Sequence, residues 1–210
     1  DDADVVITEI GGTIGDIESL PFIEAIRQFG FEEGKSNCLY IHLTLLTYLR
    51  AAGELKTKPT QQSVGKLREI GIIPDILVCR SEMPMTDEIR KKLSLFCQVE
   101  AKAVIEELDV KNTIYEVPIV LYEQGFDALA IEKLGLSSQS HDADLSKWRS
   151  MVDAYINPER EVRIAVVGKY IELNDAYKSI YEALNHGGLP TKTRVRIEKV
   201  STDRVDVNDP

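Results

Sequence analysis

Two apolar, β-prone stretches with a helical stretch between them decide the fold class of this chain. Residues 38–46 read CLYIHLTLL and residues 75–80 read DILVCR, and both have the length and composition of buried strands. Between them a helix is predicted to run to Ile70, with its apolar residues on one face, and Gly71 supplies its end. A strand, a helix and a further strand in this order predict neighbouring parallel strands covered by a helix.

The same alternation of strand and helix continues on both sides of this unit. It predicts an α/β fold, with a mostly parallel sheet and flanking helices. Such sheets bind ligands in the loops at the carboxyl ends of their strands, which is where Glu9, Arg80 and Asp109 are expected. The further predicted elements are strands at 5–7, 104–105 and 113–117, a helix over 20–28 capped by Ser19, a helix capped by Thr86, and a helix over 125–134.

The composition changes after Leu136, where a polar stretch begins at residues 137–142. We interpret residues 137–161 as a linker that carries a short helix around Trp148. A new unit begins at Val162, and its pattern predicts one β-α-β unit. Its predicted elements are a strand over 163–167, a turn at Gly168, a helix over 175–185 and a strand over 194–200.

The overall composition excludes several classes of function. The chain has 210 residues, of which 43% are hydrophobic and 29% are charged, as is typical of a globular protein. Its formal net charge of −10 argues against an unspecific nucleic-acid or anionic membrane surface. No apolar run approaches the ~20 residues that span a bilayer.

The cysteines and the chain ends indicate the setting of the protein. Three widely spaced cysteines, Cys38, Cys79 and Cys97, favour reduced and buried thiols in a cytoplasmic protein. The chain shows no signal peptide and opens without Met at Asp1. It also ends at Pro210 without a natural stop, so we expect an interior piece of a longer protein.

A glycine-rich loop at Glu9–Glu18 (EIGGTIGDIE) is the first candidate site. Its three glycines let the backbone approach a ligand and offer N–H groups to an anion. Its carboxylates could hold Mg²⁺ through oxygen. The alternative is an ordinary turn between a strand and a helix, with solvated acids. No Gly-Lys-Ser/Thr follows, so the loop is not a Walker loop.

A basic loop at Lys56–Gln61 (KTKPTQ) is the second candidate site. Two lysines and two hydroxyls just before a helix suit a phosphate chain. The alternative is a solvated helix entry. A basic run at 90–92 is typical of a solvated helix face, and His42, His141 and His186 lack the spacing of metal ligands.

Four stretches of the chain match one known family in order and spacing, and they are Glu9–Ser19 (EIGGTIGDIES), Lys56–Gln61, Pro74–Ser81 (PDILVCRS) and Val166–Ser179 (VVGKYIELNDAYKS). With them the chain closely resembles the CTP synthases, the glutamine-dependent UTP amidoligases, in their bacterial form. The resemblance implies the C-terminal part of a P-loop, dethiobiotin synthetase-like amidoligase domain over 1–136, the linker over 137–161, and the start of a class I glutaminase domain over 162–210.

The resemblance also implies a reaction in pyrimidine nucleotide biosynthesis. Enzymes of this family use ATP and Mg²⁺ to phosphorylate the 4-oxygen of UTP, and ammonia from glutamine displaces the phosphate to give CTP. CTP is then expected as an allosteric inhibitor and GTP as an activator. The full-length enzyme is expected to be a cytoplasmic homotetramer, without nucleic-acid or membrane partners.

Residue by residue, the resemblance assigns four groups of ligand contacts. Glu9 matches a Mg²⁺ ligand, and Asp16, Ile17 and Glu18 match the segment linked to feedback inhibition by CTP. The positions that match the UTP and CTP site are Lys56, Thr57, Lys58, Pro59, Thr60, Gln61 and Lys92. The positions that match the ATP site are Arg80, Leu108, Asp109 and Val110, and the family often has lysine in place of Leu108.

The departures from the family concern catalysis. The family's phosphate loop with its catalytic lysine, and a second Mg²⁺-binding carboxylate, precede the position of residue 1. The glutaminase nucleophile and its partners follow the position of residue 210. The chain also has Leu46-Thr47-Tyr48 where the family commonly has Val-Pro-Tyr. We therefore expect the 210 residues alone to be inactive.

Two rival interpretations remain open at the level of the sequence. One is a non-catalytic homologue that binds nucleotide or serves in assembly. The other is a different ATP-dependent amidoligase, similar to dethiobiotin synthetase, and the glutaminase-like start at Val162 argues against it.

Overall fold

The computed structural model describes residues 3–136 and 143–204, which form two compact units. The first unit holds residues 3–110 and 117–136, and the second holds 111–116 and 143–204. The polar stretch at which we predict the linker to begin, with His141, lies outside the described residues. The predicted domain boundaries at 136 and 162 remain predictions.

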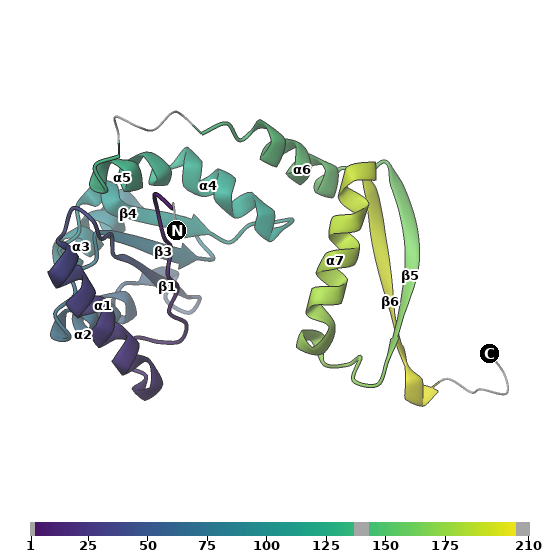
Figure 1. Cartoon of the computed structure of the whole chain (residues 1–210), viewed down its shortest axis with the longest axis horizontal. Coiled ribbons are helices and arrows are strands. Elements are labelled where there is room, and N and C mark those ends of the chain that lie inside the picture. Colours follow the sequence, from purple (N-terminus) through teal and green to yellow (C-terminus); the bar gives the residue numbers. More distant parts are fainter. Residues whose placement is uncertain (1–2, 137–142, 205–210) are drawn as a thin grey trace. The chain divides into compact units, whose positions relative to one another are not determined.

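The first unit is built on a four-stranded sheet in the order β2-β1-β3-β4 (Figure 1). The central strands β1 (Ile41–Leu49) and β3 (Ile76–Ser81) are parallel, and β4 (Val104–Leu108) is parallel to β3. The short strand β2 (Glu54–Lys56) is antiparallel to β1. This arrangement confirms the predicted α/β fold with a mostly parallel sheet.

Helices of the first unit lie on both sides of this sheet, although they leave one face of β1 uncovered (Figure 1). Their limits follow local signals: the Thr86 hydroxyl accepts a hydrogen bond from the N–H of Ile89 at 3.3 Å, and Gly71 and Gly135, at φ 98° and 68°, follow the ends of two helices. The helices are α1 (Leu20–Glu33), α2 (Lys58–Glu69), α3 (Asp87–Cys97), α4 (Val117–Glu123) and α5 (Phe126–Lys133).

The main core lies between the sheet and helices α2 and α3. Val64 of α2, Leu93 of α3 and Leu77 of β3 are fully buried there. The Thr60 hydroxyl of α2 donates a hydrogen bond to that of Thr44 on β1 at 3.3 Å. These contacts fix the first turn of α2 against the sheet, and this turn carries one of the candidate sites.

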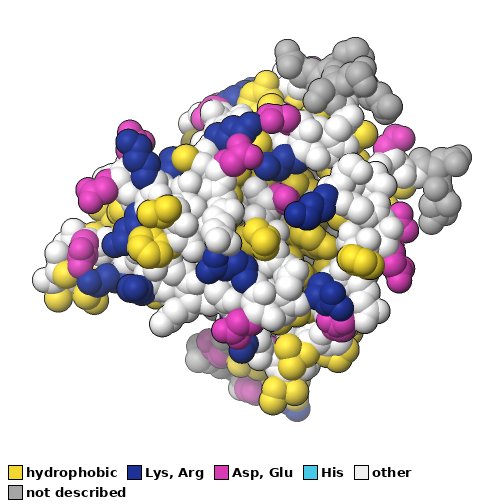
Figure 2. All heavy atoms as spheres, turned by 90° about the vertical axis from the view of Figure 1, so that its left-hand side faces the viewer, with side chains coloured by type: hydrophobic (Ala, Val, Ile, Leu, Met, Phe, Trp, Pro, Cys, Tyr) yellow, Lys and Arg dark blue, Asp and Glu magenta, His cyan; other side chains and the backbone are white. Residues whose placement is uncertain are grey.

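The outer face of β1 carries exposed aliphatic side chains in alternation with the buried ones. Leu43 and Leu45 are 62% and 58% exposed, whereas Thr44 and Leu46 between and after them are buried. On the face drawn in Figure 2, hydrophobic side chains reach the surface among the charged ones. The alternation shows that β1 is covered by helices of the described chain on one face only.

Two predicted strands are wrong. Residues 5–7 pair with no strand of the described chain, and their side chains are 49–90% exposed. An edge is open to them, since β2 pairs with β1 only at Thr47–Leu49 and no described strand lies beside residues 41–46 on that side, yet residues 5–7 do not add to it. Residues 114–116 form a 3₁₀ turn that leads into α4 instead of a strand.

The turn before α4 has a specific local cause. The Glu116 carboxylate accepts the N–H of Thr113 at 2.8 Å, and the Thr113 hydroxyl accepts the N–H of Tyr115 at 3.4 Å. This pattern is close to a capping box, the Thr-x-x-Glu signature of a helix start, with the Thr113 hydroxyl bonded to the N–H of Tyr115 instead of that of Glu116. It outweighs the β-prone composition from which the strand was predicted.

The second unit contains the predicted β-α-β pattern (Figure 1). Strands β5 (Arg160–Gly168) and β6 (Thr193–Ser201) are parallel along nine paired residues, with helix α7 (Lys178–Gly188) between them in sequence. Helix α6 (Ser146–Ile156) precedes them. The predicted helix start near residue 175 is a 3₁₀ turn, and the α-helix proper begins at Lys178.

The cysteines are free thiols, as expected. Cys79 and Cys97 are buried in the main core, and Cys38, just before β1, is half-buried. Within the part of the chain that the structure describes, no helix combines the length and the apolar character needed to cross a membrane.

Candidate functional site

The basic loop at residues 56–61 forms the entry to helix α2. Lys56 ends strand β2, Thr57 is the N-cap residue, and Lys58 and Pro59 begin the helix. The Thr57 hydroxyl accepts a hydrogen bond from the side chain of Gln61 at 3.1 Å and makes no side-chain cap bond. No side chain caps the N–H groups of the first turn, which leaves them available to a phosphate.

Within this loop the two threonines and the two lysines have different roles. The side chains of Thr57 and Thr60 are 5% and 1% exposed, and they anchor the turn. Lys58 is exposed and Lys56 is half-exposed. A ligand at this turn would therefore meet the two ammonium groups, whereas Thr60 could reach it only through its backbone.

Lys92 of helix α3 lies close to this loop. The pKa of Glu54 on β2 is lowered, first by a hydrogen bond from Lys56 and further by the positive charge of Lys92. Lys92 thus lies within electrostatic range of Glu54, the ion-pair partner of Lys56, and we call Lys56, Lys58 and Lys92 the basic cluster. Within the run at 90–92, Arg90 instead donates a hydrogen bond to the backbone carbonyl of Val104.

Arg80 and Asp109 form an ion pair at the carboxyl ends of β3 and β4. The Arg80 Nε donates to the Asp109 carboxylate at 2.8 Å, and this hydrogen bond raises the pKa of Arg80. The Asp109 N–H donates to the carbonyl of Ser81 at 2.9 Å, so that Asp109 is tied to β3 through its backbone as well. Leu108 and Val110 flank Asp109 at this edge of the sheet.

Glu107 is a residue at this edge that the sequence interpretation missed. It stands opposite Arg80 in the register of β3 and β4, so both side chains project from the same face of the sheet. Partial burial raises the pKa of its carboxyl. The sequence does contain an indication of this role. Glu107 stands two residues before Asp109, and this spacing places both carboxylates on one side of an extended chain.

The glycine-rich loop is explained largely by its own turn. The Asp16 carboxylate accepts the N–H of Thr13 at 2.8 Å, and Gly12 and Gly15 have φ values of 85° and 102°. Such positive values favour glycine. Ile17 and Glu18 are exposed. The Glu18 carboxylate therefore does not help to hold the turn as the Asp16 carboxylate does.

Glu9 supplies a single exposed carboxylate. Among the residues that the structure describes, no three His, Cys, Asp or Glu side chains are grouped closely enough to hold a metal ion. Magnesium is usually held by one or two carboxylates together with substrate phosphates and waters. The position of Glu9 fits a metal shared with a nucleotide and does not fit a metal site made by these residues alone.

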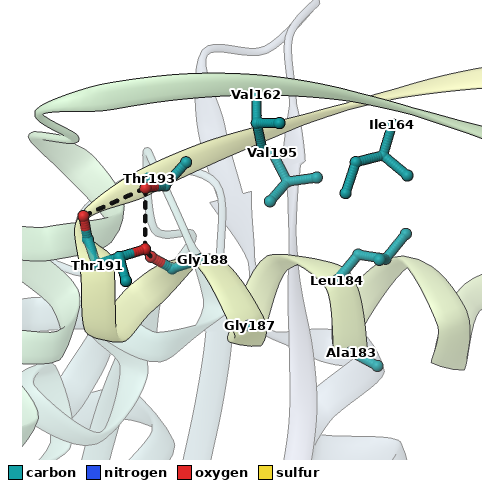
Figure 3. A pocket seen from close by; sticks show the side chains of 9 residues that line it. All are labelled: Val162, Ile164, Ala183, Leu184, Gly187, Gly188, Thr191, Thr193 and Val195. Carbon is teal, nitrogen blue, oxygen red and sulfur yellow. Dashed lines mark hydrogen bonds between the residues drawn. The ribbon is translucent and has the colours of Figure 1, made fainter.

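A pocket in the second unit lies between α7 and the β5–β6 sheet, with a volume of about 270 Å³ (Figure 3). Its walls are mostly aliphatic, as at Val162, Leu184 and Val195, and a pair of threonines closes one end. It contains no charged side chain and none of the predicted site residues. We therefore do not attribute it to a nucleotide site.

Comparison with known proteins agrees with the motifs. The family model of the CTP synthase N-terminus matches residues 1–136. The chain is 58% identical to the CTP synthase of Methanocaldococcus jannaschii over 203 residues, which cover 97% of this chain and 37% of that protein.

Two further relatives show the same pattern. The CTP synthase of Methanococcus maripaludis is 55% identical over 208 residues (99% of this chain, 38% of that protein), and that of Clostridium perfringens is 55% identical over 204 residues (97% and 38%). The chain thus spans less than two fifths of the length of these relatives. On the family match and these identities, the chain belongs to the CTP synthase family.

Proposed function

We propose that the protein to which this chain belongs is a ligase that converts UTP to CTP, with ATP as the phosphoryl donor and glutamine as the nitrogen source. The observation that carries the proposal is the basic cluster at the N-terminus of α2, in a chain whose formal net charge is −10. The family membership supports the same reaction.

The basic cluster would bind the triphosphate of UTP, and that of the inhibitor CTP. Three ammonium groups and the uncapped N–H groups of α2 present positive charge to a phosphate chain. Lys56 and Lys58 reach it from the loop and Lys92 reaches it from α3. Phosphoryl transfer depends mainly on positioning and on neutralising charge, so these residues would hold UTP while its base reacts.

The base of ATP would lie at the edge formed by Arg80, Leu108, Asp109 and Val110. Asp109 fixes the Arg80 guanidinium through Nε, so its flat face is available to a planar base. The neighbouring backbone groups after β4 could then bind the edge of that base. Leu108 would contribute through its backbone, since its side chain cannot replace the lysine ammonium group that the resemblance implies at this position.

Glu9 would be one ligand of a Mg²⁺ ion that it shares with the ATP phosphates. When bound, this ion would neutralise charge that develops on the transferred phosphoryl group. Asp16, Ile17 and Glu18 would contact CTP in its inhibitory position. Asp16 would do so from within its own turn, and Glu18 through its exposed carboxylate.

Residues 162–210 would be the beginning of the glutaminase that supplies ammonia. The β5-α7-β6 pattern agrees with the start of an α/β domain. We further propose regulation by GTP, a homotetrameric assembly in the cytoplasm, and no activity for the 210 residues alone.

The proposed function is tested in the full-length parent protein by the variant Glu9→Ala. With ammonia as the nitrogen source, formation of CTP from UTP and ATP should fall at least about a hundredfold, because loss of a metal ligand costs several kcal/mol of transition-state stabilisation. Hydrolysis of glutamine should remain measurable. Glu33→Ala, at the exposed end of α1, serves as the matched control.

A non-catalytic nucleotide-binding homologue is the rival. It would bind UTP and ATP in the wild type and form no CTP with ammonia. Near-normal CTP formation by Glu9→Ala would instead reject the role of Glu9 and leave the reaction itself in place.

A further inference from the structure

Residues Lys111–Glu116, which we call the strap, are part of the second unit although both flanking segments belong to the first. In sequence the strap lies well inside residues 1–136, which match the family model of the CTP synthase N-terminus. The chain therefore leaves the first unit after Val110, packs in the second, and returns at Val117. A segment placed in this way can connect events in the two units through the chain itself.

The strap is held in the second unit by Tyr115. Its ring packs edge-on against Trp148 and Tyr155 of α6, with ring centroids 6.3 and 6.1 Å away. The Trp148 indole N–H donates to the backbone carbonyl of Tyr115 at 2.7 Å. The strap is thus fixed to α6 by both a side chain and a backbone group.

The Tyr115 hydroxyl extends this attachment to α7. It donates a hydrogen bond to the Glu182 carboxylate at 2.8 Å and also contacts Nε2 of His186. A phenol has one proton, and Tyr115 gives it to Glu182, so Nε2 of His186 must be the donor in the second contact. Burial and the Glu182 carboxylate raise the pKa of Tyr115 to about 12, which keeps the hydroxyl protonated at neutral pH.

The strap is also stiff within itself. The Glu116 carboxylate accepts the N–H groups of Asn112 at 2.9 Å and of Thr113 at 2.8 Å, and these bonds lower the pKa of Glu116. Thr113 is 8% exposed. A displacement at one end of such a closed turn is passed to the other end instead of being absorbed.

Lys111, the first residue of the strap, directly follows Val110, the last residue of the proposed ATP site. Only Val110 separates Lys111 from Asp109, which is bonded to Arg80 and to Ser81. Two residues span at most about 7 Å, so movement of Asp109 on binding a nucleotide would displace the start of the strap.

We propose that the strap couples nucleotide binding at Arg80 and Asp109 to the chemistry of the second unit, through the contacts of Tyr115 with α6 and α7. This inference rests on the proposed function. It assigns to Tyr115 a positioning role, outside the groups that touch substrate. Binding of ATP and UTP then changes the rate of glutamine hydrolysis, and the Tyr115 hydroxyl carries part of that change.

The test uses the full-length parent protein with the variant Tyr115→Phe, which retains the ring contacts and removes the hydroxyl. The rate of glutamine hydrolysis is measured with and without ATP and UTP, and CTP formation is measured with ammonia. We expect the nucleotide-induced change in hydrolysis to shrink about fivefold, the lower range of coupling between sites. CTP formation with ammonia should stay within twofold of the wild type.

Two further variants make the result specific. Tyr155→Phe is the matched control, because it removes a hydroxyl from the same aromatic group and keeps the ring against Tyr115. Trp148→Phe removes the indole donor to the Tyr115 carbonyl and should weaken the nucleotide response as Tyr115→Phe does.

A nucleotide response in Tyr115→Phe equal to that of the wild type overturns the proposal, as does an equal loss in Tyr155→Phe. A parallel loss of CTP formation with ammonia overturns it too, because the hydroxyl would then serve folding or the first unit. Failure of the wild type to form CTP with ammonia would instead reject the proposed function.

Discussion

The side-chain amide of Gln124 pairs with both backbone groups of Glu106. The Glu106 N–H donates to Oε1 of Gln124 at 2.9 Å, and Nε2 of Gln124 donates to the Glu106 carbonyl. The amide thereby takes the place of a neighbouring strand at the outer edge of β4, which is the last strand of its sheet. The unpaired N–H and C=O groups of an edge strand can pair with another chain, and a side chain that hydrogen-bonds to them prevents this association.

Gln124→Met should lower the free energy of unfolding by about 1–3 kcal/mol, because two partly buried backbone groups lose their partners. Hydrogen exchange of the peptide that contains Glu106 should accelerate, and mass spectrometry would measure it. Gln62→Met, on the exposed side of α2, is the matched control and should change neither quantity. Unchanged exchange at Glu106 in Gln124→Met would contradict the pairing.

The adjacent glycines of α7 should respond in opposite directions to alanine. A Cβ at Gly187 would meet no atom within 4 Å, whereas one at Gly188 would lie 2.2 Å from the carbonyl oxygen of Thr193. Gly187→Ala should raise the free energy of unfolding by about 0.5–1 kcal/mol through helix propensity. Gly188→Ala should lower it by about 1–3 kcal/mol through overpacking.

The single tryptophan makes this comparison simple, since Trp148 belongs to the second unit and its fluorescence in urea reports the unfolding of that unit. Shifts of both variants in the same direction would show that α7 does not approach β6 as described.

The Cys79 thiol should make stability fall in alkaline solution. Burial raises its pKa to about 12, although a weak hydrogen bond from the Thr44 hydroxyl at 3.8 Å opposes this shift. Above about pH 9 the unfolded thiol loses its proton while the native thiol keeps it until about pH 12. The unfolded state then binds fewer protons, so stability falls by about 1.4 kcal/mol per pH unit in this window.

Urea unfolding at several pH values measures this slope. Cys79→Ala should flatten it, and Cys38→Ala, at a half-buried position, should leave it as in the wild type. Equal slopes in the wild type and in Cys79→Ala would show that other groups dominate the alkaline loss.

Lys92→Ala in the full-length parent should raise the Michaelis constant for UTP about tenfold or more, because a charge-assisted contact with phosphate contributes about 1.5–3 kcal/mol. Lys91→Ala is the matched control, since Lys91 is exposed on the same helix and stands next to Lys92 in sequence. Initial rates at varied UTP concentration, with ammonia as the nitrogen source, give the Michaelis constant for UTP in each variant. Equal increases of the Michaelis constant in the two variants would show that Lys92 does not bind the triphosphate.

Glu18→Lys in the full-length parent should weaken inhibition by CTP more than it weakens use of UTP. The two nucleotides share a triphosphate, so the basic cluster cannot distinguish them, and an exposed carboxylate beside the glycine-rich loop can. We expect a loss of about 1–3 kcal/mol in CTP binding, or roughly tenfold to a hundredfold. Equal changes in the CTP inhibition constant and the UTP Michaelis constant would show that Glu18 acts at the triphosphate site that both nucleotides share.

The helices and parallel strands were predictable because their signals are local. Thr86 and Gly71 mark helix ends through bonds within a few residues, and β1 and β3 are apolar stretches of strand length. The predicted strand at 5–7 fails because a strand also needs a partner elsewhere in the chain, and a single apolar stretch does not contain that information. The strand β2 was missed for the same reason, since it exists only through its pairing with β1.

The candidate site was predictable in part. The composition of Lys56–Gln61 indicates a phosphate site, and the strand ends at Arg80 and Asp109 indicate where ligands lie. Composition alone assigned Lys92 to a solvated face, because its closeness to Glu54 depends on how α3 packs against the sheet. Only the resemblance placed Lys92 at the site. The contacts of Tyr115 with the second unit gave no signal, since its partners are 33–71 residues away in sequence.

The return of the chain at Val117 has a consequence for the evolution of these proteins. A single crossover between two genes, placed after the region of residues 1–136, would combine the strap of one parent with the α6 and α7 of the other. Such a hybrid would set a foreign residue 115 against Glu182 and His186. The two halves should therefore have been inherited as one piece, and substitutions at position 115 should be accompanied by substitutions at 182 and 186 among relatives.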